Sequence, residues 1–266
     1  DSFYVVTGSA FGAHDMGWIR SNSPDDGSVI VRDLTSARAV LNIVGPKSRE
    51  VLQSVCEDDV SNTAFRYAKA REITIGSAPV LAVRIGYVGE LGWELHIPTE
   101  YAAHVYQLLH AAGQAHGIVD VGYRTIDTMR MEKGYVYWST DVTPDTTPWE
   151  SGLSWRVNLH KGDFLGRDAL VAQKEAGATR TLCTFTLESM AYPVSGEAIM
   201  VPGDDRVVGF TTSANFGHTV GKPIVYGYLP VELTDRSEFI IEVYGEPIAA
   251  IRHDRPLYDP DNVRLK

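Results

Sequence analysis

The stretch "APVLAVRIGYVGELGWELHIP", residues 78–98, decides how the fold of this chain is interpreted. Apolar residues alternate with other residues along its two ends, "APVLAVRIGY" and "GWELHIP", and a period of two is typical of β-strands. The two ends therefore predict a β-hairpin that turns at Val88-Gly89. In the returning strand, Trp93 and Leu95 share one face and are expected to point into a core.

Glu94 stands between those two apolar residues, so we expect its side chain on the opposite face of the strand. A carboxylate has two acceptor oxygens and can pair with two parallel N–H donors of a planar heterocycle. Tyr87 or Trp93 nearby can cover the face of such a ring. The alternative, an exposed strand glutamate that binds nothing, stays open on composition alone.

Helices and further strands are predicted on both sides of this hairpin. Residues 2–10 ("SFYVVTGSA") and 37–45 ("ARAVLNIVG") have the apolar, β-branched character of strands. Thr99 is placed to cap a helix whose apolar residues follow at helical spacing. Further helices are expected after Gly45-Pro46, over about residues 124–133 with a stop at Gly134, and over residues 166–177 with Gly177 as the C-cap.

After Gly177 the helical periodicity stops and short strands with turn residues between them follow. Six are expected, at "RTLCTFTL", "EAIMV", "RVVGFTTSA", "IVYGYLP", "EFIIEVYG" and "PIAAIRH". This pattern is typical of a small β-barrel or sandwich. The sequence therefore predicts an α+β protein, with an α/β region over residues 1–177 and a small C-terminal β-barrel domain over residues 178–266.

Composition excludes several classes of protein. The 266 residues are 44% hydrophobic and 22% charged, which is ordinary for a globular chain. The net charge of −10 argues against nucleic-acid binding, and no apolar run approaches the ~18–20 residues of a membrane span. Cys56 and Cys183 match no metal spacing, and the scattered histidines do not indicate a metal site. We expect a reducing compartment, the cytoplasm or, in a eukaryote, the mitochondrial matrix.

Two further segments combine aromatic residues with glycine turns. In "IDTMRMEKGYVYWSTD", Arg130, Asp127 and Glu132 are expected to form ion pairs on a helix surface, and an aromatic run begins at Tyr135. In "TTPWESGLSWRVNLHKGDFLGRDAL", Trp155 is expected on a strand. For both aromatic groups, packing in a core remains the alternative to ligand contact. The residues alone do not choose a substrate.

Several collinear motifs resemble the glycine-cleavage T-protein family of tetrahydrofolate-dependent one-carbon transferases. They run along nearly the whole chain: "FYVVTGSA", "LNIVGPKSREVL", "GYVGELGWELHIP", "TMRMEKGYVYWSTDVTPDTTPWESGLSW", "KGDFLGRDAL", "VGFTTSANFGHTVGKPIVYGYLP" and "RPLYDP". Within the family, "DLTSARAVLNIVGP", "GELGWEL", "YRTIDTMRMEKGY" and "DFLGRDAL" look most like the C-terminal folate module of dimethylglycine and sarcosine dehydrogenases or oxidases.

The resemblance implies a folate site and names its residues. Glu94 matches the glutamate that binds the pterin ring, and Tyr87 matches a tyrosine of the same pocket. Trp155 matches a tryptophan that lines the site, and Tyr135 is carried over from the motif around "KGYVYW". The catalytic aspartate of the family lies upstream of "FYVVTG", so we identify no catalytic residue in this chain, and we expect about 120 residues before Asp1.

The resemblance also implies a function. It is a tetrahydrofolate-dependent module that captures an iminium-derived one-carbon unit from a small N-methyl amine as 5,10-methylenetetrahydrofolate. FAD is expected only in a flavin domain of the same parent chain or of a partner, and this chain alone is expected to be inactive. T-proteins usually have an arginine at the position of Ile126, and its absence favours the dehydrogenase subgroup. A stand-alone aminomethyltransferase, a non-catalytic folate-binding scaffold and a demethylase of sulfur or oxygen methyl groups are the alternatives.

Overall fold

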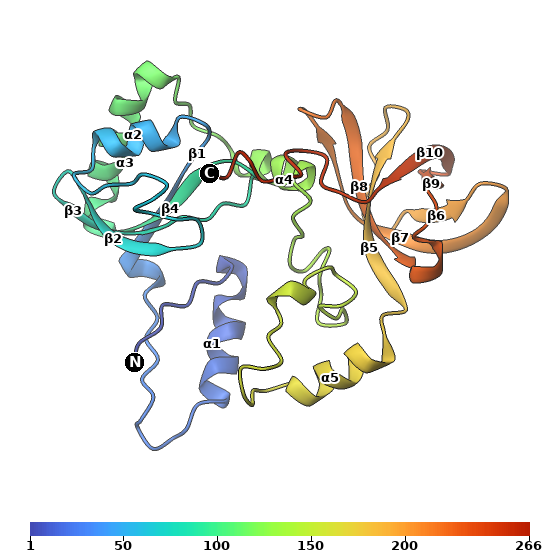
Figure 1. Cartoon of the computed structure of the whole chain (residues 1–266), viewed down its shortest axis with the longest axis horizontal. Coiled ribbons are helices and arrows are strands. Elements are labelled where there is room, and N and C mark those ends of the chain that lie inside the picture. Colours follow the sequence, from blue (N-terminus) through green and yellow to red (C-terminus); the bar gives the residue numbers. More distant parts are fainter.

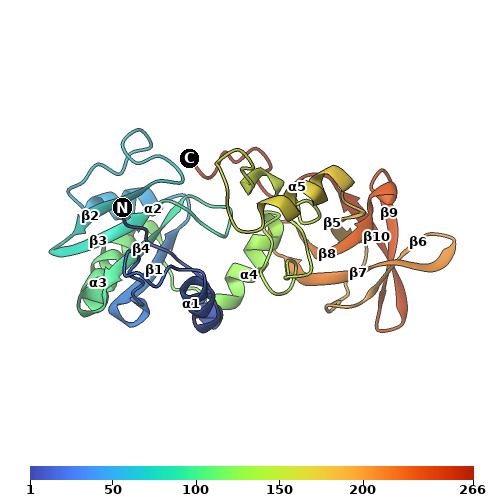
Figure 2. The same cartoon turned by 90° about the horizontal axis from the view of Figure 1, so that it is seen from below.

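A computed structural model describes all residues from Asp1 to Lys266. The chain forms an α+β part around strands β1–β4 and a closed six-stranded barrel of β5–β10, with helix α4 between them in both views (Figures 1 and 2). The predicted α+β class with a C-terminal barrel is confirmed. No helix is long and apolar enough to span a bilayer.

The helices are α1 (Gly12–Ser21), α2 (Ser48–Ser54), α3 (Ala102–Gly113), α4 (Tyr123–Glu132) and α5 (Arg167–Ala176). The strands of the first part are β1 (Arg38–Val44), β2 (Ala70–Ile75), β3 (Ala78–Val83) and β4 (Gly92–Pro98). The strands of the barrel are β5 (Arg180–Leu187), β6 (Ala198–Val201), β7 (Asp204–Gly217), β8 (Lys222–Pro230), β9 (Glu238–Val243) and β10 (Glu246–His253). The expected helices at 124–133 and 166–177 and all six late strands are present, with ends shifted by a few residues.

The sheet of the first part has the order β1-β4-β3-β2, and all its neighbours are antiparallel. Its register places Leu95 opposite Leu41 and Trp93 opposite Ile43. These side chains share a hydrophobic core with apolar residues of α2 and α3, and Trp93 and Leu95 are fully buried. The predicted antiparallel pairing and its inward-facing residues are confirmed, but β3 ends at Val83, so a loop over residues 84–91 replaces the expected tight turn at Val88-Gly89.

The opposite face of the sheet has much less cover. Because residues paired directly across an antiparallel ladder share a face, Glu94 lies between Asn42 on β1 and Val83 on β3. Asn42 is exposed and Val83 is half-buried. His96, two residues along β4, lies on this face as well and contacts Tyr4 of the N-terminal segment.

Two glycines of the opening stretch permit close backbone approaches. A Cβ on Gly92 would lie 2.5 Å from the Ile43 carbonyl oxygen, so only glycine lets β4 pack this closely on β1 at that position. Gly89 has a φ of +76°, and a Cβ there would lie 2.8 Å from the Lys133 side chain. The loop between β3 and β4 thereby packs against the end of α4.

Two local predictions are wrong. Residues 2–10 form no strand: they pair with no neighbour, all are exposed, and Ser9–Phe11 is a turn of 3-10 helix. Strand-like composition does not form a strand without a partner edge. Thr99 does not cap α3, because a 3-10 turn over Thr99–Tyr101 comes first and the Thr99 hydroxyl donates to the Ser36 carbonyl at 3.1 Å.

The barrel closes in the order β10-β5-β8-β7-β6-β9. Its core includes Phe185, Ile199, Val225, Phe239 and Ile241, all fully buried or nearly so. Closure leaves no free strand edge. The domain boundary between residues 177 and 178 stays a prediction; α5 ends at Ala176 and β5 begins at Arg180.

After the barrel, residues 254–266 run back to the α+β part, and we call them the return segment (Figure 1). Its Asp259 forms an ion pair with Lys133 at 2.9 Å. The Leu265 carbonyl accepts a hydrogen bond from Arg84 at 2.9 Å. The Tyr258 hydroxyl donates to Glu90. Since Lys133, Arg84 and Glu90 are buried, the return segment completes the joint between the two parts.

Candidate folate site

Glu94 is a largely buried carboxylate whose acceptors are free. Its side chain is 24% exposed, and no donor of the chain makes a hydrogen bond to it. Its ionisable neighbour is His96, whose Nε2 lies 3.7 Å from a Glu94 oxygen, beyond hydrogen-bonding distance. Both lone-pair sets of the carboxylate can therefore accept hydrogen bonds from a ligand.

His96 is buried beside Glu94, with only one of its ring nitrogens paired. Its Nδ1 lies 3.2 Å from the Tyr4 hydroxyl, while Nε2 has no hydrogen-bond partner. If Tyr4 donates to Nδ1, the tautomer places the ring N–H on Nε2, on the side of Glu94. A polar pair thus faces the less covered side of the sheet.

Tyr87 and Tyr135 form a stacked pair. Their ring centroids are 6.0 Å apart with the planes 12° from parallel. The Tyr87 hydroxyl donates to the Val136 carbonyl at 2.6 Å. Burial raises the pKa of each tyrosine to about 12, so both are neutral hydroxyls near pH 7. The pair offers a flat, uncharged wall.

The expected Arg130–Asp127 ion pair is present, but Arg130 is buried and not on the helix surface, and Glu132 forms no ion pair. Arg130 is 2% exposed and donates through Nε to Asp127 at 2.8 Å and through NH1 to Asp141 at 2.6 Å. Its NH2 donates to Ser213 of β7 at 2.8 Å. Glu132 is also buried and accepts the backbone N–H of Thr219 at 2.6 Å. These charges face the barrel, because α4 packs on β7 and β8.

Asp141 ties this network to the aromatic pair. Besides Arg130, it accepts the Tyr137 backbone N–H at 2.8 Å and the Thr212 hydroxyl at 2.6 Å. Arg130 also donates to the Tyr135 carbonyl at 3.1 Å. Burial lowers the pKa of Arg130, but Asp141 and Asp127 outweigh this effect and leave its pKa above the usual value. The buried Arg130–Asp141 pair therefore fixes the backbone of Tyr135.

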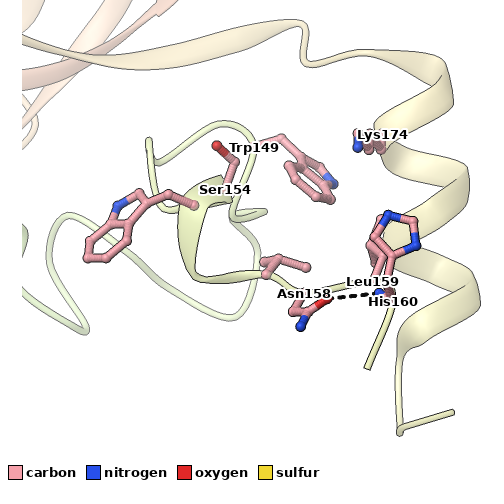
Figure 3. Close-up of a pocket in the computed structure, with 8 residues that line it drawn as sticks. Trp149, Ser154, Asn158, Leu159, His160 and Lys174 are labelled. Atoms are coloured by element: carbon pink, nitrogen blue, oxygen red, sulfur yellow. Dashed lines mark hydrogen bonds between the residues drawn. The ribbon is translucent and has the colours of Figure 1, made fainter. Parts of the chain in front are cut away.

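Trp155 lies in a different part of the molecule. It sits in a 3-10 helix (Ser154–Arg156), so the expected strand is wrong. Trp155 is 69% exposed, and the Arg156 guanidinium stacks on its ring at 4.0 Å. It lines a cavity of about 390 Å³ together with Trp149, His160, Lys174 and four other residues (Figure 3).

Of the four residues assigned to the folate site, the structure joins only Tyr87 and Tyr135 by direct contact. Tyr87 lies in the loop before β4, and Glu94 lies on β4 itself. Trp155 forms no hydrogen bond or aromatic pair with the other three residues. Sequence reasoning missed His96, although the period of two places it on the same face as Glu94. It also missed Asp141, whose partner on β7, Thr212, is distant in the sequence. No group of three or more His, Cys, Asp or Glu side chains is placed to hold a metal ion.

The fold and this site define a class: an α+β domain with a carboxylate on the open face of its sheet, followed by a closed antiparallel barrel. Comparison with known families agrees. The family model described as "GCVT N-terminal domain" matches residues 1–161, and "Glycine cleavage T-protein C-terminal barrel domain" matches residues 180–259. The chain belongs to the glycine cleavage T-protein family.

Similar proteins have longer chains. Mouse mitochondrial sarcosine dehydrogenase is 38% identical over 100% of this chain, which covers 30% of that protein. Mouse mitochondrial dimethylglycine dehydrogenase is 34% identical over 99% of this chain and 31% of its own length. The crystal structure of glycine cleavage system aminomethyltransferase T from Bartonella henselae superposes with a TM-score of 0.74 at 25% identity, over 84% of this chain and 60% of that one. This chain thus spans about a third of the two dehydrogenases.

Proposed function

We propose that this chain is the tetrahydrofolate-dependent one-carbon-transfer module of an enzyme like sarcosine or dimethylglycine dehydrogenase. Membership of the T-protein family implies tetrahydrofolate binding. The observation that carries the proposal is Glu94, a carboxylate only 24% exposed whose oxygens receive no donor from the chain. A group so placed is stabilised when a ligand supplies the missing N–H donors.

The residues present fit a reduced pterin. Its edge presents an amino group and a ring N–H side by side, which matches the two acceptors of the Glu94 carboxylate. Tyr87 and Tyr135 provide a stacked aromatic wall, and aromatic rings are preferred neighbours of flat heterocycles. Trp155 is assigned to the same ligand.

When bound, tetrahydrofolate supplies the nitrogens that take up the one-carbon unit, with 5,10-methylenetetrahydrofolate as the product. The contribution of this chain is positioning: Glu94 fixes the orientation of the pterin, and the buried Arg130–Asp141 pair holds the tyrosine wall. The oxidation that generates the iminium is assigned to a flavin domain of the parent protein, and the amine is a small N-methyl amine. No residue of this chain is assigned as the proton-transferring group.

A stand-alone aminomethyltransferase is the second candidate, favoured by the superposition on the Bartonella henselae protein. Ile126, half-buried on α4, argues against it, because T-proteins usually have a folate-contacting arginine there. The sequence upstream of Asp1 separates the two candidates. A G-x-G-x-x-G dinucleotide fingerprint between a strand and a helix supports the dehydrogenase, and its absence supports the transferase.

Replacement of Glu94 by alanine tests the pterin assignment. In the full-length protein, Glu94→Ala should weaken tetrahydrofolate binding by roughly 1–3 kcal/mol, because ligand donors lose their acceptors. Glu72→Ala is the matched control: Glu72 lies on the same face of the sheet, on edge strand β2, and is exposed. Titration calorimetry that gives both variants the wild-type affinity would rule out Glu94 as the pterin ligand.

A further inference from the structure

The loop between β3 and β4, which carries Tyr87, is held at both of its ends by the return segment. At the start of the loop, Arg84 donates through Nη2 to the Leu265 carbonyl at 2.9 Å. At the end of the loop, the Glu90 carboxylate accepts the Tyr258 hydroxyl. Tyr87 lies between these two contacts, so the return segment restrains the part of the loop that belongs to the proposed pterin wall.

A third contact supports the loop through α4. A Cβ on Gly89 would lie 2.8 Å from the Lys133 side chain, so the loop backbone packs directly on that side chain. Lys133 Nζ donates to the Asp259 carboxylate at 2.9 Å and to the Asp259 carbonyl at 2.6 Å. The side chains of Lys133 and Asp259 are 1% and 7% exposed, so solvent screens this ion pair little. Asp259 therefore fixes the surface on which the loop rests.

The return segment is anchored before it reaches the loop. Leu257 packs on a small buried cluster of α4 and β8 that includes Met131 and Tyr226. The Tyr258 backbone N–H donates to the Glu132 carbonyl at 2.9 Å. Figure 1 shows the segment running from the barrel past α4 to the α+β part. The position of the loop is thereby tied to the barrel.

The contact at Glu90 has no substitute within the chain. Glu90 is 8% exposed, and the Tyr258 hydroxyl is the only hydrogen-bond donor to its carboxylate. Arg264 of the return segment adds an ion pair at 3.7 Å, beyond hydrogen-bonding distance. Since a buried acceptor without a donor is costly, loss of the Tyr258 hydroxyl favours conformations in which the loop moves and Glu90 reaches water.

We propose that the return segment holds Tyr87 in place for the pterin, with Tyr258 and Asp259 as positioning residues. They act through Glu90 and Lys133, which fix the loop and with it the Tyr87 ring in the stacked wall. The inference rests on the proposed function, because it concerns the same folate site. A freed loop presents Tyr87 correctly for only part of the time, and the apparent affinity falls by that fraction.

Tetrahydrofolate affinity and melting temperature, measured together on the full-length protein, test this role. Tyr258→Phe keeps the ring and removes the hydroxyl. In titration calorimetry it should weaken tetrahydrofolate binding about 3- to 10-fold, as expected if the loop is in place for about a third to a tenth of the time. Asp259→Asn should weaken binding less, because the Asp259 carbonyl still accepts from Lys133.

Two controls separate positioning from stability. Tyr106→Phe removes the same kind of bond on the surface, since the Tyr106 hydroxyl donates to the Asp120 carboxylate at 2.8 Å. Ile199→Val removes a methyl group from the barrel core, where Ile199 is fully buried, and should lower the melting temperature. Both controls should bind tetrahydrofolate with wild-type affinity below their melting temperatures. A purely structural role of Tyr258 predicts the behaviour of Ile199→Val.

Tyr87→Ala shows whether the effect passes through Tyr87. In that background, Tyr258→Phe should cause no further loss of affinity, because residues that act as a unit are not additive. An equal loss in both backgrounds would overturn the assignment. If Tyr258→Phe keeps wild-type affinity while Glu94→Ala and Tyr87→Ala weaken binding, the positioning role is wrong and the proposed function stands. If Glu94→Ala and Tyr87→Ala both keep wild-type affinity, the proposed function fails and this inference fails with it.

Discussion

Replacement of Asp141 by asparagine should destabilise the protein strongly, although the two side chains have nearly the same shape. Asp141 is completely buried and lies 2.6 Å from an Arg130 nitrogen, with Arg130 itself 2% exposed. Removing one partner of a buried ion pair leaves an uncompensated charge and typically costs about 3–5 kcal/mol. Asp127 stays beside Arg130 at 2.8 Å but is 41% exposed, so it compensates only in part.

The hydrogen bonds of Asp141 predict a smaller loss of stability for Asp141→Asn than for Asp141→Ala. An asparagine oxygen can still accept from Arg130 and Tyr137, and its amide can turn to the Thr212 hydroxyl, so Asp141→Asn should lose about 3 kcal/mol. Asp141→Ala loses all these acceptors and should approach about 5 kcal/mol. At ~2–4 °C per kcal/mol, the asparagine variant should melt about 6–12 °C below wild type.

Thermal unfolding followed by circular dichroism measures the change, with Asp168→Asn as the matched control. Asp168 is 98% exposed and lies 3.5 Å from Arg167, so removal of its charge should change stability by less than about 0.5 kcal/mol. If Asp141→Asn melts within a degree of Asp168→Asn, the buried pair does not stabilise the joint, and the reasoning is refuted.

Three smaller predictions concern stability. Gly89→Ala should destabilise more than Gly27→Ala in urea unfolding; both have φ near +80°, about 1–2 kcal/mol of strain for alanine, but only Gly89 has neighbours within 4 Å. Burial raises the pKa of Tyr87 to about 12, so the contribution of the neutral Tyr87 to the free energy of unfolding is lost as the pH rises from 10 to 12. Tyr87→Phe should reduce this loss of stability at alkaline pH, as followed by circular dichroism. Burial raises the pKa of Glu150, but hydrogen bonds from Thr147 and Arg180 outweigh this effect and leave the pKa below its usual value. The free energy of unfolding should therefore decrease as the pH falls below 4.5, and it should decrease less in Glu150→Gln, as measured by acid titration.

Local periodicity was sufficient to predict much of the fold. The alternation around Trp93 and Leu95 gave the hairpin and its buried face, and Gly134 and Gly177 marked the ends of two helices. The late strands were found because each is short, lies between turn residues and has no helical periodicity. Such signals depend on neighbours in the chain, which a single sequence contains.

Contacts between residues that are distant in the sequence could not be predicted from these local signals. Arg130 looked like a surface residue because its pattern fits an exposed helix, yet Ser213, distant in sequence, binds its guanidinium in the interior. Residues 2–10 have strand composition but find no edge to pair with. Trp155 was placed near Glu94 by resemblance, and neither spacing nor periodicity could reveal that it lines a separate cavity with Trp149.

The return segment has a consequence for biosynthesis. Translation produces the α+β part first and residues 254–266 only after the whole barrel. The hydrogen-bond partners of Arg84 and Glu90 in this last segment, Leu265 and Tyr258, are therefore synthesised late. Domains generally fold in order as they leave the ribosome. Here the α+β part can collapse early. Arg84 and Glu90 in its interior nevertheless lack these partners until the barrel has emerged from the ribosome. The nascent chain therefore passes through a partly folded intermediate that chaperones can recognise.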